Sequence, residues 1–152
     1  MDAVFKKLNF KDQPEILVIN HPASFQPNLD AMAGLAKIQT EVAKAGKIHF
    51  ALAFVTKQVE VDTLATQIAA KTEGDALVWF AYPKGTSKKY KCEFNRDTGW
   101  AILGKLGFEG VRQVAIDEDW SALRFRRAEF IKTMVRNEKL ALSKEGKAKL
   151  KK

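Results

Sequence analysis

The sequence contains few of the residues that cross-link a chain or bind a metal. One of its 152 residues is a cysteine, Cys92, and two are histidines. A single cysteine excludes a disulfide bond within the chain and is typical of a reducing compartment, so we expect a cytoplasmic protein. Two histidines and one cysteine cannot supply a convincing zinc site, and no metal site is predicted.

Long apolar segments and nucleotide-binding motifs are also lacking. No segment has the roughly 18 apolar residues that span a bilayer, and the N-terminal segment contains no apolar run typical of a signal peptide. The chain has neither the G-x-x-x-x-G-K-[ST] spacing of a phosphate-binding loop nor a G-x-G-x-x-G motif after its first apolar run. The sequence therefore lacks the two best-defined nucleotide motifs and leaves any cofactor unidentified.

The composition is that of a globular protein with an uneven charge. Hydrophobic residues make up 46% of the chain and charged residues 29%, which is a folded rather than a disordered mixture. Residues 138–152 hold six lysines and two glutamates, which is half of the net charge of +8. We expect one α/β domain over residues 1–137 and a frayed basic tail over 138–152. One hypothesis makes this tail a nucleic-acid or protein interaction module, although no aromatic residues are interleaved there to stack on bases.

Five apolar runs are predicted to be strands. They span residues 15–20, 48–55, 76–82, 111–117 and 120–127. Continuous rather than alternating runs are typical of strands that are covered on both faces, as in a parallel sheet. The fifth run follows the fourth too closely for a crossover connection, so these two are expected to form an antiparallel hairpin. Arg124 and Arg126 in the fifth run favour a position at the edge of the sheet.

The helical spacing of apolar residues predicts four helices between and after these strands. They span residues 28–46, 56–74, 95–107 and 128–142. The resulting order predicts an α/β protein with a three-layer Rossmann-like sheet, mostly parallel, with a C-terminal antiparallel hairpin and a final helix. If the first three strands lie in sequence, their crossover helices cover one face, and the final helix, assisted by the N-terminal segment, covers the other. The hairpin then completes the sheet as 1-2-3-5-4 or 1-2-3-4-5, and the sequence leaves both orders open.

The main functional hypothesis concerns the carboxyl ends of the parallel strands, because ligands of open α/β sheets bind there. The loop after the third strand has four lysines, small hydroxyl residues and a glycine, and it leads to a predicted helix start at Asn95. These are the ingredients of an anion site. We therefore predict a small binding or regulatory module for a small anionic, phosphate-type ligand. The predicted ligand contacts are His21, Ser24, Lys84, Gly85, Ser87, Lys88, Asp117 and Trp120.

A second hypothesis makes the chain a small enzyme of unassigned reaction that uses His21, Cys92 or Asp117. His21 follows the first strand and is a candidate general base. The nearby Lys89 and Lys91 are expected to lower the pKa of the Cys92 thiol and so favour a nucleophilic thiolate. Asp117 belongs to an acidic turn that suits acid–base chemistry, metal binding or, more simply, cross-strand pairing with arginines.

Two blocks of sequence carry a family resemblance. Residues 76–87, ALVWFAYPKGTS, and residues 115–127, AIDEDWSALRFRR, together with the opening strand and its loop over 16–25, resemble an uncharacterised bacterial family known as domain of unknown function 3052. The resemblance implies a small α/β protein and no established activity, cofactor or catalytic residue. The strand order also resembles the later half of a Rossmann-type methyltransferase sheet, which is an analogy of fold only. The glycine-rich methyl-donor loop of such enzymes is missing from this sequence.

Overall fold

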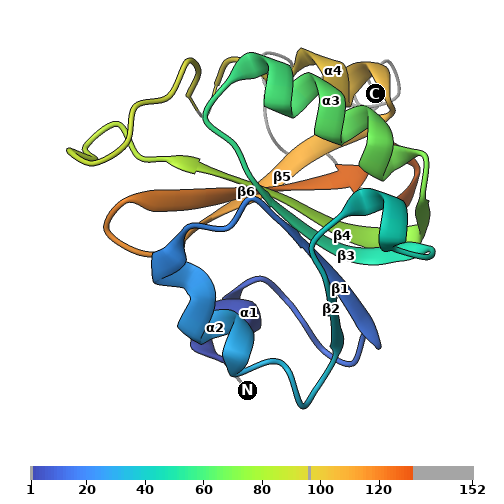
Figure 1. Ribbon diagram of the computed structural model, residues 1–152. Coiled ribbons are helices and arrows are strands. Elements are labelled where there is room, and N and C mark those ends of the chain that lie inside the picture. Colours follow the sequence, from blue (N-terminus) through green and yellow to red (C-terminus); the bar gives the residue numbers. More distant parts are fainter. Residues whose placement is uncertain (1, 96, 132–152) are drawn as a thin grey trace.

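Six strands form one sheet in the computed structural model, which describes residues 2–95 and 97–131. Their order across the sheet is β2-β1-β3-β4-β6-β5 (Figure 1). β1 pairs in parallel with β2 and β3, β3 pairs in parallel with β4, and β6 pairs antiparallel with both β4 and β5. The strands are β1 (Glu15–Ile19), β2 (Lys37–Gln39), β3 (Ile48–Phe54), β4 (Thr72–Pro83), β5 (Phe108–Ala115) and β6 (Trp120–Arg127). The predicted Rossmann-like α/β class is thereby confirmed.

Helical segments cover both faces of the sheet and make three layers (Figure 1). On one face lie η2 (Val42–Lys44), α3 (Gln58–Ala69) and α4 (Ala101–Lys105). On the other face lie α1 (Ala3–Lys7), η1 (Ala23–Phe25) and α2 (Gln26–Asp30). No helix within the described part of the chain has the length and apolar character needed to cross a membrane.

The strand residues divide between two cores, one on each face. In β4, Val78 and Phe80 pack under α3 and α4, whereas Leu77 and Trp79 pack on the side of α1 and α2. β4 is therefore buried without interruption over residues 76–83. Burial on both faces explains why this strand is a continuous apolar run in the sequence rather than an alternating one.

The main departure from the prediction lies in residues 28–46, which do not form one helix. α2 ends at Asp30, and β2 then pairs in parallel with residues 15–17 of β1. A strand of three residues carries almost no periodic signal, and its pairing depends on contacts with a distant segment. β2 brings the connections before and after it onto opposite faces of the sheet. As a result α2 covers the face that the prediction assigned to the final helix and the N-terminal segment. α1, which belongs to that N-terminal segment, lies on this face as expected.

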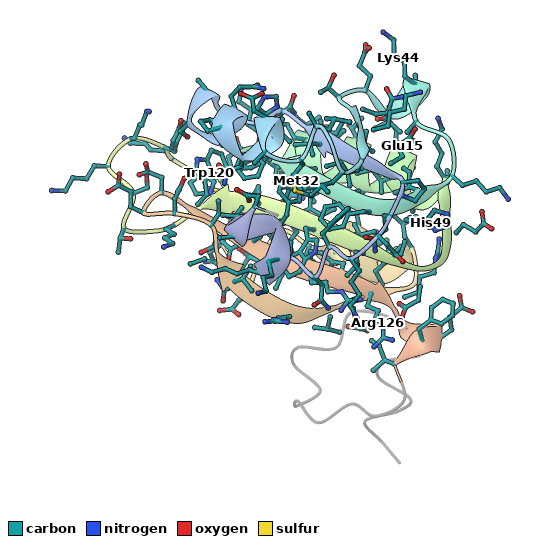
Figure 2. All side chains as sticks on the ribbon, turned by 90° about the horizontal axis from the view of Figure 1, so that it is seen from below. Glu15, Met32, Lys44, His49, Trp120 and Arg126 are labelled. Atoms are coloured by element: carbon teal, nitrogen blue, oxygen red, sulfur yellow. The ribbon has the colours of Figure 1, made fainter. Side chains whose placement is uncertain are left out.

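The C-terminal hairpin lies in the sheet as β4-β6-β5, so the expected edge position of the fifth predicted strand is wrong. The interior strand tolerates Arg126 because its guanidinium forms an ion pair with Asp75, with 2.6 Å between Nη2 and Oδ2. Burial, followed by repulsion from Arg126, lowers the pKa of Arg124. Trp120 and Arg126 lie at opposite ends of β6 (Figure 2). A 3-10 helix, η3 (Ala128–Phe130), follows, and most of the predicted helix 128–142 lies outside the described residues.

The third predicted helix begins later than expected. Asn95 does not start a helix, because its side-chain oxygen accepts the N–H of Asp97 in a turn, and α4 begins only at Ala101. Gly99 separates the two, with a φ of +91° that favours glycine. A Cβ atom at this position would lie 2.6 Å from the Cβ of Phe94. The chain therefore needs glycine here, and the helix cannot extend back to Asn95.

Candidate functional site at the carboxyl ends of the strands

The sheet has a topological switch point at the carboxyl ends of β1 and β3. β1 is followed by β2 on one side, and the chain then returns to form β3 on the other side. The connections diverge at this point, and open α/β sheets bind ligands in the crevice that results. A cavity of about 350 Å³ lies there, and we call it the crevice. Its lining residues are Asn20, Pro22, Ala23, Phe54, Thr56, Glu60, Tyr90 and Trp120.

Aromatic rings form much of the crevice wall. The ring of Trp120 lies 5.1 Å from that of Phe54 in an edge-to-face arrangement and 4.9 Å from that of Tyr90. Trp120 is only 4% exposed and lies beside η1 and α2 (Figure 2). Its buried indole Nε1 has no hydrogen-bond partner among the described residues. A buried indole N–H normally has an acceptor, so Trp120, a lining residue of the crevice, carries a donor that the described protein does not use.

The polar part of the crevice comes from the start of α3 and the end of β1. Glu60 Oε1 accepts hydrogen bonds from the N–H and hydroxyl of Thr56 and from the N–H of Lys57, which caps α3. This arrangement fixes the carboxylate at the rim of the crevice. Asn20, the residue after β1, has a φ of +57°. Non-glycine residues in this left-handed region are uncommon and often occur at functional sites.

A larger pocket of about 860 Å³ lies at the carboxyl end of β4. It is formed by the end of β4, the loop that follows this strand, and two residues of β5 and β6. Its lining residues include Tyr82, Lys84, Gly85, Ser87, Tyr90, Lys91, Cys92, Phe94, Gln113 and Ser121. Gln113 Nε2 donates a hydrogen bond of 2.7 Å to the hydroxyl of Tyr82, which ties the floor of the pocket together. Tyr90 lines both this pocket and the crevice.

The predicted site residues do not converge on one cavity. Three of them, Lys84, Gly85 and Ser87, line the larger pocket, and Trp120 lines the crevice. The other four, His21, Ser24, Lys88 and Asp117, are not among the lining residues of either cavity.

Two of those four have other hydrogen-bonding partners. His21 Nε2 lies 2.8 Å from Gln26 Oε1, on the side of α2. The carboxylate of Asp117 accepts the N–H groups of Asp119 and Trp120, which closes the turn between β5 and β6. These contacts are hydrogen bonds with backbone N–H groups of the turn and not the cross-strand pairing with arginines that the sequence suggested. Arg126 pairs with Asp75 instead.

The lysine-bearing loop does not have the geometry of an anion site. The N–H of Lys84 donates to the carbonyl of Asp119, and the Ser87 hydroxyl donates to Asp119 Oδ1 at 2.8 Å. Ser87 Oγ in turn accepts the N–H groups of Lys89 and Tyr90. Several donors of the loop are thus used within the loop and beside a carboxylate. The loop also leads into a turn rather than a helix start.

The pKa of the Cys92 thiol is raised, and the lysines do not lower it as expected. The main cause is burial, which disfavours the charged thiolate. The nearby carboxylates of Glu93 and Glu60 act in the same direction, and only a hydrogen bond with the backbone of Phe94 opposes them. Cys92 therefore remains a protonated thiol at neutral pH. This protonation state does not suit a nucleophile.

Sequence reasoning missed most of the crevice. It singled out Trp120, the loop after β1 and Thr56 at the start of the second predicted helix, but not Phe54, Glu60 or Tyr90. Glu60 is the third residue of α3 and closes a capping box with the N-cap Lys57, but lysine is not a usual N-cap residue, so this arrangement leaves little signal in the sequence. Nothing in the sequence marks Tyr90, because a loop folded back by Ser87 and Asp119 brings it to the crevice. Within residues 2–95 and 97–131, no cluster of three or more acidic, histidine or cysteine side chains is placed to hold a metal ion.

Comparisons with known proteins bear on the fold. Neither a family model nor a curated protein matches the chain, so the resemblance to domain of unknown function 3052 stays a prediction. A S-adenosylmethionine-dependent methyltransferase from Aquifex aeolicus is similar in structure, with a TM-score of 0.58 and 14% identity, over 82% of this chain and 87% of that one. Magnesium protoporphyrin IX methyltransferase from Synechocystis PCC 6803, solved with bound S-adenosylmethionine, has a TM-score of 0.51 and 11% sequence identity. The match covers 82% of this chain and 74% of that one. A NADB-Rossmann superfamily protein from Streptococcus agalactiae has a TM-score of 0.50 and 10% sequence identity. The match covers 84% of this chain and 68% of that one.

These neighbours define the class of the protein as a Rossmann-like α/β fold of the kind found in S-adenosylmethionine-dependent methyltransferases. They also correct the main functional hypothesis. The prediction of a binding or regulatory module for a small anionic ligand is wrong, because the structural neighbours are enzymes of methyl transfer rather than anion-binding modules. The same finding overturns the small anionic ligand as a predicted partner, whereas nucleic acid, which the sequence made possible but did not favour, stays an untested hypothesis. The basic tail on which the nucleic-acid hypothesis depended lies outside the described residues.

Proposed function

We propose that the protein is a small methyltransferase that binds S-adenosylmethionine in the crevice and its methyl acceptor in the larger pocket. The observation that carries this proposal is the unpartnered indole N–H of Trp120, buried in an aromatic cavity at the switch point of a methyltransferase-like sheet. The fold supports the reaction class, and the crevice supports the position of the donor. The free thiol of Cys92 is in keeping with a cytoplasmic location, which is part of the proposal.

The residues of the crevice fit the nucleoside part of such a donor. The rings of Phe54, Tyr90 and Trp120 offer surfaces on which a flat heterocycle packs, and the Trp120 N–H offers a donor to a ring nitrogen. Glu60, held by its capping bonds, offers a carboxylate oxygen to an amine or hydroxyl group. Ligand sites commonly combine apolar walls with a few fixed polar groups in this way.

The loop after β1 departs from the glycine-rich pattern of methyl-donor sites. Residues 20–25 are NHPASF and contain no glycine. Asn20 adopts the left-handed conformation that a glycine takes most easily, and it redirects the chain from β1 into η1. Asparagine tolerates this conformation better than most residues, so the turn forms without glycine. The side chains of Pro22 and Ala23 line the crevice where a glycine loop would leave open space.

The mechanism assigned to the chain itself is one of binding and orientation. S-adenosylmethionine held by Phe54, Glu60 and Trp120 would supply a methyl group on a sulfonium sulfur for transfer to a nucleophile of the acceptor. The aromatic walls exclude water, and the carboxylate of Glu60 favours a nearby positive charge. The acceptor approaches from the larger pocket past Tyr90, which lines both cavities. Cys92 is not assigned the role of nucleophile, because its thiol stays protonated.

Isothermal titration calorimetry with S-adenosylmethionine and S-adenosylhomocysteine tests this proposal. We expect binding by the wild-type protein, and a roughly tenfold weaker affinity in Trp120→Phe, which keeps an aromatic ring but removes the N–H donor. His21→Ala is the matched control, because His21 lies outside both cavities and is expected to leave the affinity unchanged. Absence of binding by the folded wild-type protein at millimolar concentration would contradict the proposal. Equal affinities of wild type and Trp120→Phe would contradict the assigned role of the indole N–H.

A further inference from the structure

Tyr90 is the structural link between the two cavities. Among the described residues, it alone lines both the crevice and the larger pocket. Its ring packs against Trp120 at 4.9 Å on the crevice side, and the ammonium group of Lys89 lies 5.5 Å from the ring centre. Tyr90 is half-buried and packs against the edge of the core on the α1 and α2 side of the sheet, where it contributes to the lining of both spaces.

A short chain of hydrogen bonds holds Tyr90 in this position. Its N–H donates to Ser87 Oγ at 3.1 Å, and the Ser87 hydroxyl donates to Asp119 Oδ1 at 2.8 Å. The N–H of Lys84 donates to the Asp119 carbonyl, which fixes the beginning of the same loop. Asp119 directly precedes Trp120. One end of β6 therefore supplies both the ring against which Tyr90 packs and the anchor of the loop that carries Tyr90.

The Tyr90 side chain itself has no comparable anchor. Its hydroxyl makes no hydrogen bond to the part of the chain that the structure describes, and residues 84–95 of its loop contain no helix or strand. The position of the ring is set by packing on Trp120 and by the backbone bond to Ser87. A ring held in this way can rotate about its side-chain bonds without breaking a hydrogen bond of its own.

We propose that Tyr90 is the specificity-determining partition between the donor and acceptor compartments, and that Ser87 and Asp119 are positioning residues that hold it there. The inference rests on the proposed function, since it takes the crevice as the donor site and the larger pocket as the acceptor site. For methyl transfer to occur between them, the sulfonium must face the boundary that Tyr90 forms. The size of the group at residue 90 then limits the size of the group that a donor can carry on its sulfur.

The test compares two donors in three proteins. Calorimetry measures the dissociation constants of S-adenosylmethionine and of an analogue in which a benzyl group replaces the transferred methyl group. The wild-type protein and Tyr90→Phe are expected to discriminate against the analogue, because both keep the ring. Tyr90→Ala is expected to reduce that discrimination at least tenfold by opening the boundary toward the larger pocket. A merely structural role for Tyr90 would weaken both ligands alike, and an unchanged ratio in Tyr90→Ala overturns the partition.

A second measurement keeps the partition testable if S-adenosylmethionine does not bind. The indole N–H of Trp120 gives its own signal in a nitrogen–proton correlation spectrum, identified by its loss in Trp120→Phe. Without any ligand, Tyr90→Ala is expected to speed its exchange with water at least tenfold, whereas Tyr90→Phe leaves it unchanged and Ser87→Ala gives an intermediate rate. Unchanged exchange in Tyr90→Ala would overturn the partition even if the donor binds. Faster exchange without donor binding would overturn the proposed function and leave Tyr90 as the boundary of the crevice.

Discussion

Trp79 and Trp120 belong to the same apolar core on the same face of the sheet, yet their indole N–H groups differ in hydrogen bonding. Trp79 is fully buried in the middle of β4 and donates its N–H to the carbonyl of Leu8 at 2.9 Å. Trp120 is nearly as buried, at the carboxyl end of the sheet, and its N–H has no partner among the described residues. The polar group at the centre of this core is satisfied within the protein, whereas the one at its carboxyl edge has no partner among the described residues.

The largest expected effect is the loss of stability when Trp79, the tryptophan with a satisfied N–H, is substituted. Trp79→Phe leaves a cavity in the core and leaves the buried carbonyl of Leu8 without its donor. We expect a loss of about 2–4 kcal/mol in the free energy of unfolding. Urea denaturation followed by far-ultraviolet circular dichroism measures this loss. A loss below about 1 kcal/mol would mean that the Trp79 hydrogen bond contributes little to the fold.

The matched substitution at the other tryptophan is expected to cost less. Trp120→Phe removes the same atoms but breaks no hydrogen bond within the described part of the chain. We expect it to cost at least about 1 kcal/mol less than Trp79→Phe, which is the contribution of one buried hydrogen bond. The same denaturation experiment gives both values. If the two variants lose equal stability, the Trp120 N–H has an acceptor in the free protein and the contrast between the two sites disappears.

The carboxyl edge also differs from the core in how it was predicted. The core strands were found from the sequence because β3 and β4 are buried on both faces, so that their runs are apolar throughout. The hairpin was found because only four residues separate β5 from β6. Each of these features is local in the sequence, and each therefore leaves a signal that residue pattern alone can detect.

The crevice depends on features that are not local. Its position follows from β2, a strand of three residues that exists because residues 37–39 meet the open edge of β1. Its wall includes Tyr90, which a serine and an aspartate 32 residues apart bring into place. The sequence indicated the carboxyl ends of the strands, where the crevice and the larger pocket lie, but it favoured the lysines of the loop over the aromatic residues behind them. Charge is visible in a sequence, whereas a shared cavity wall appears only after the chain has folded.

A smaller effect is expected in the larger pocket, where the position of Ser87 can be tested. Ser87→Ala removes a hydroxyl that donates to Asp119 and accepts two backbone N–H groups of an exposed loop. We expect a loss of about 1 kcal/mol in the free energy of unfolding, since water replaces most of these bonds. The matched control is Ser24→Ala, at an exposed residue outside both cavities, which is expected to change the stability by less than about 0.5 kcal/mol. Equal effects of the two substitutions would mean that the hydrogen bonds of Ser87 do not anchor the loop that carries Tyr90.

The smallest expected effect concerns Cys92, which lies in the larger pocket and reports how far that pocket is removed from water. Burial raises the pKa of its thiol, so the folded protein retains this proton at pH values where the unfolded chain has begun to lose it. Stability is therefore fully present below the ordinary thiol pKa and declines as the pH rises through it. The rate of alkylation by iodoacetamide, measured from pH 7 to 10, is expected to have a midpoint above that of free cysteine in the folded protein and at the free-cysteine value in urea. A midpoint below that of free cysteine would restore the thiolate nucleophile that the lysines of the loop first suggested, and would assign the chemistry to the larger pocket rather than to the crevice.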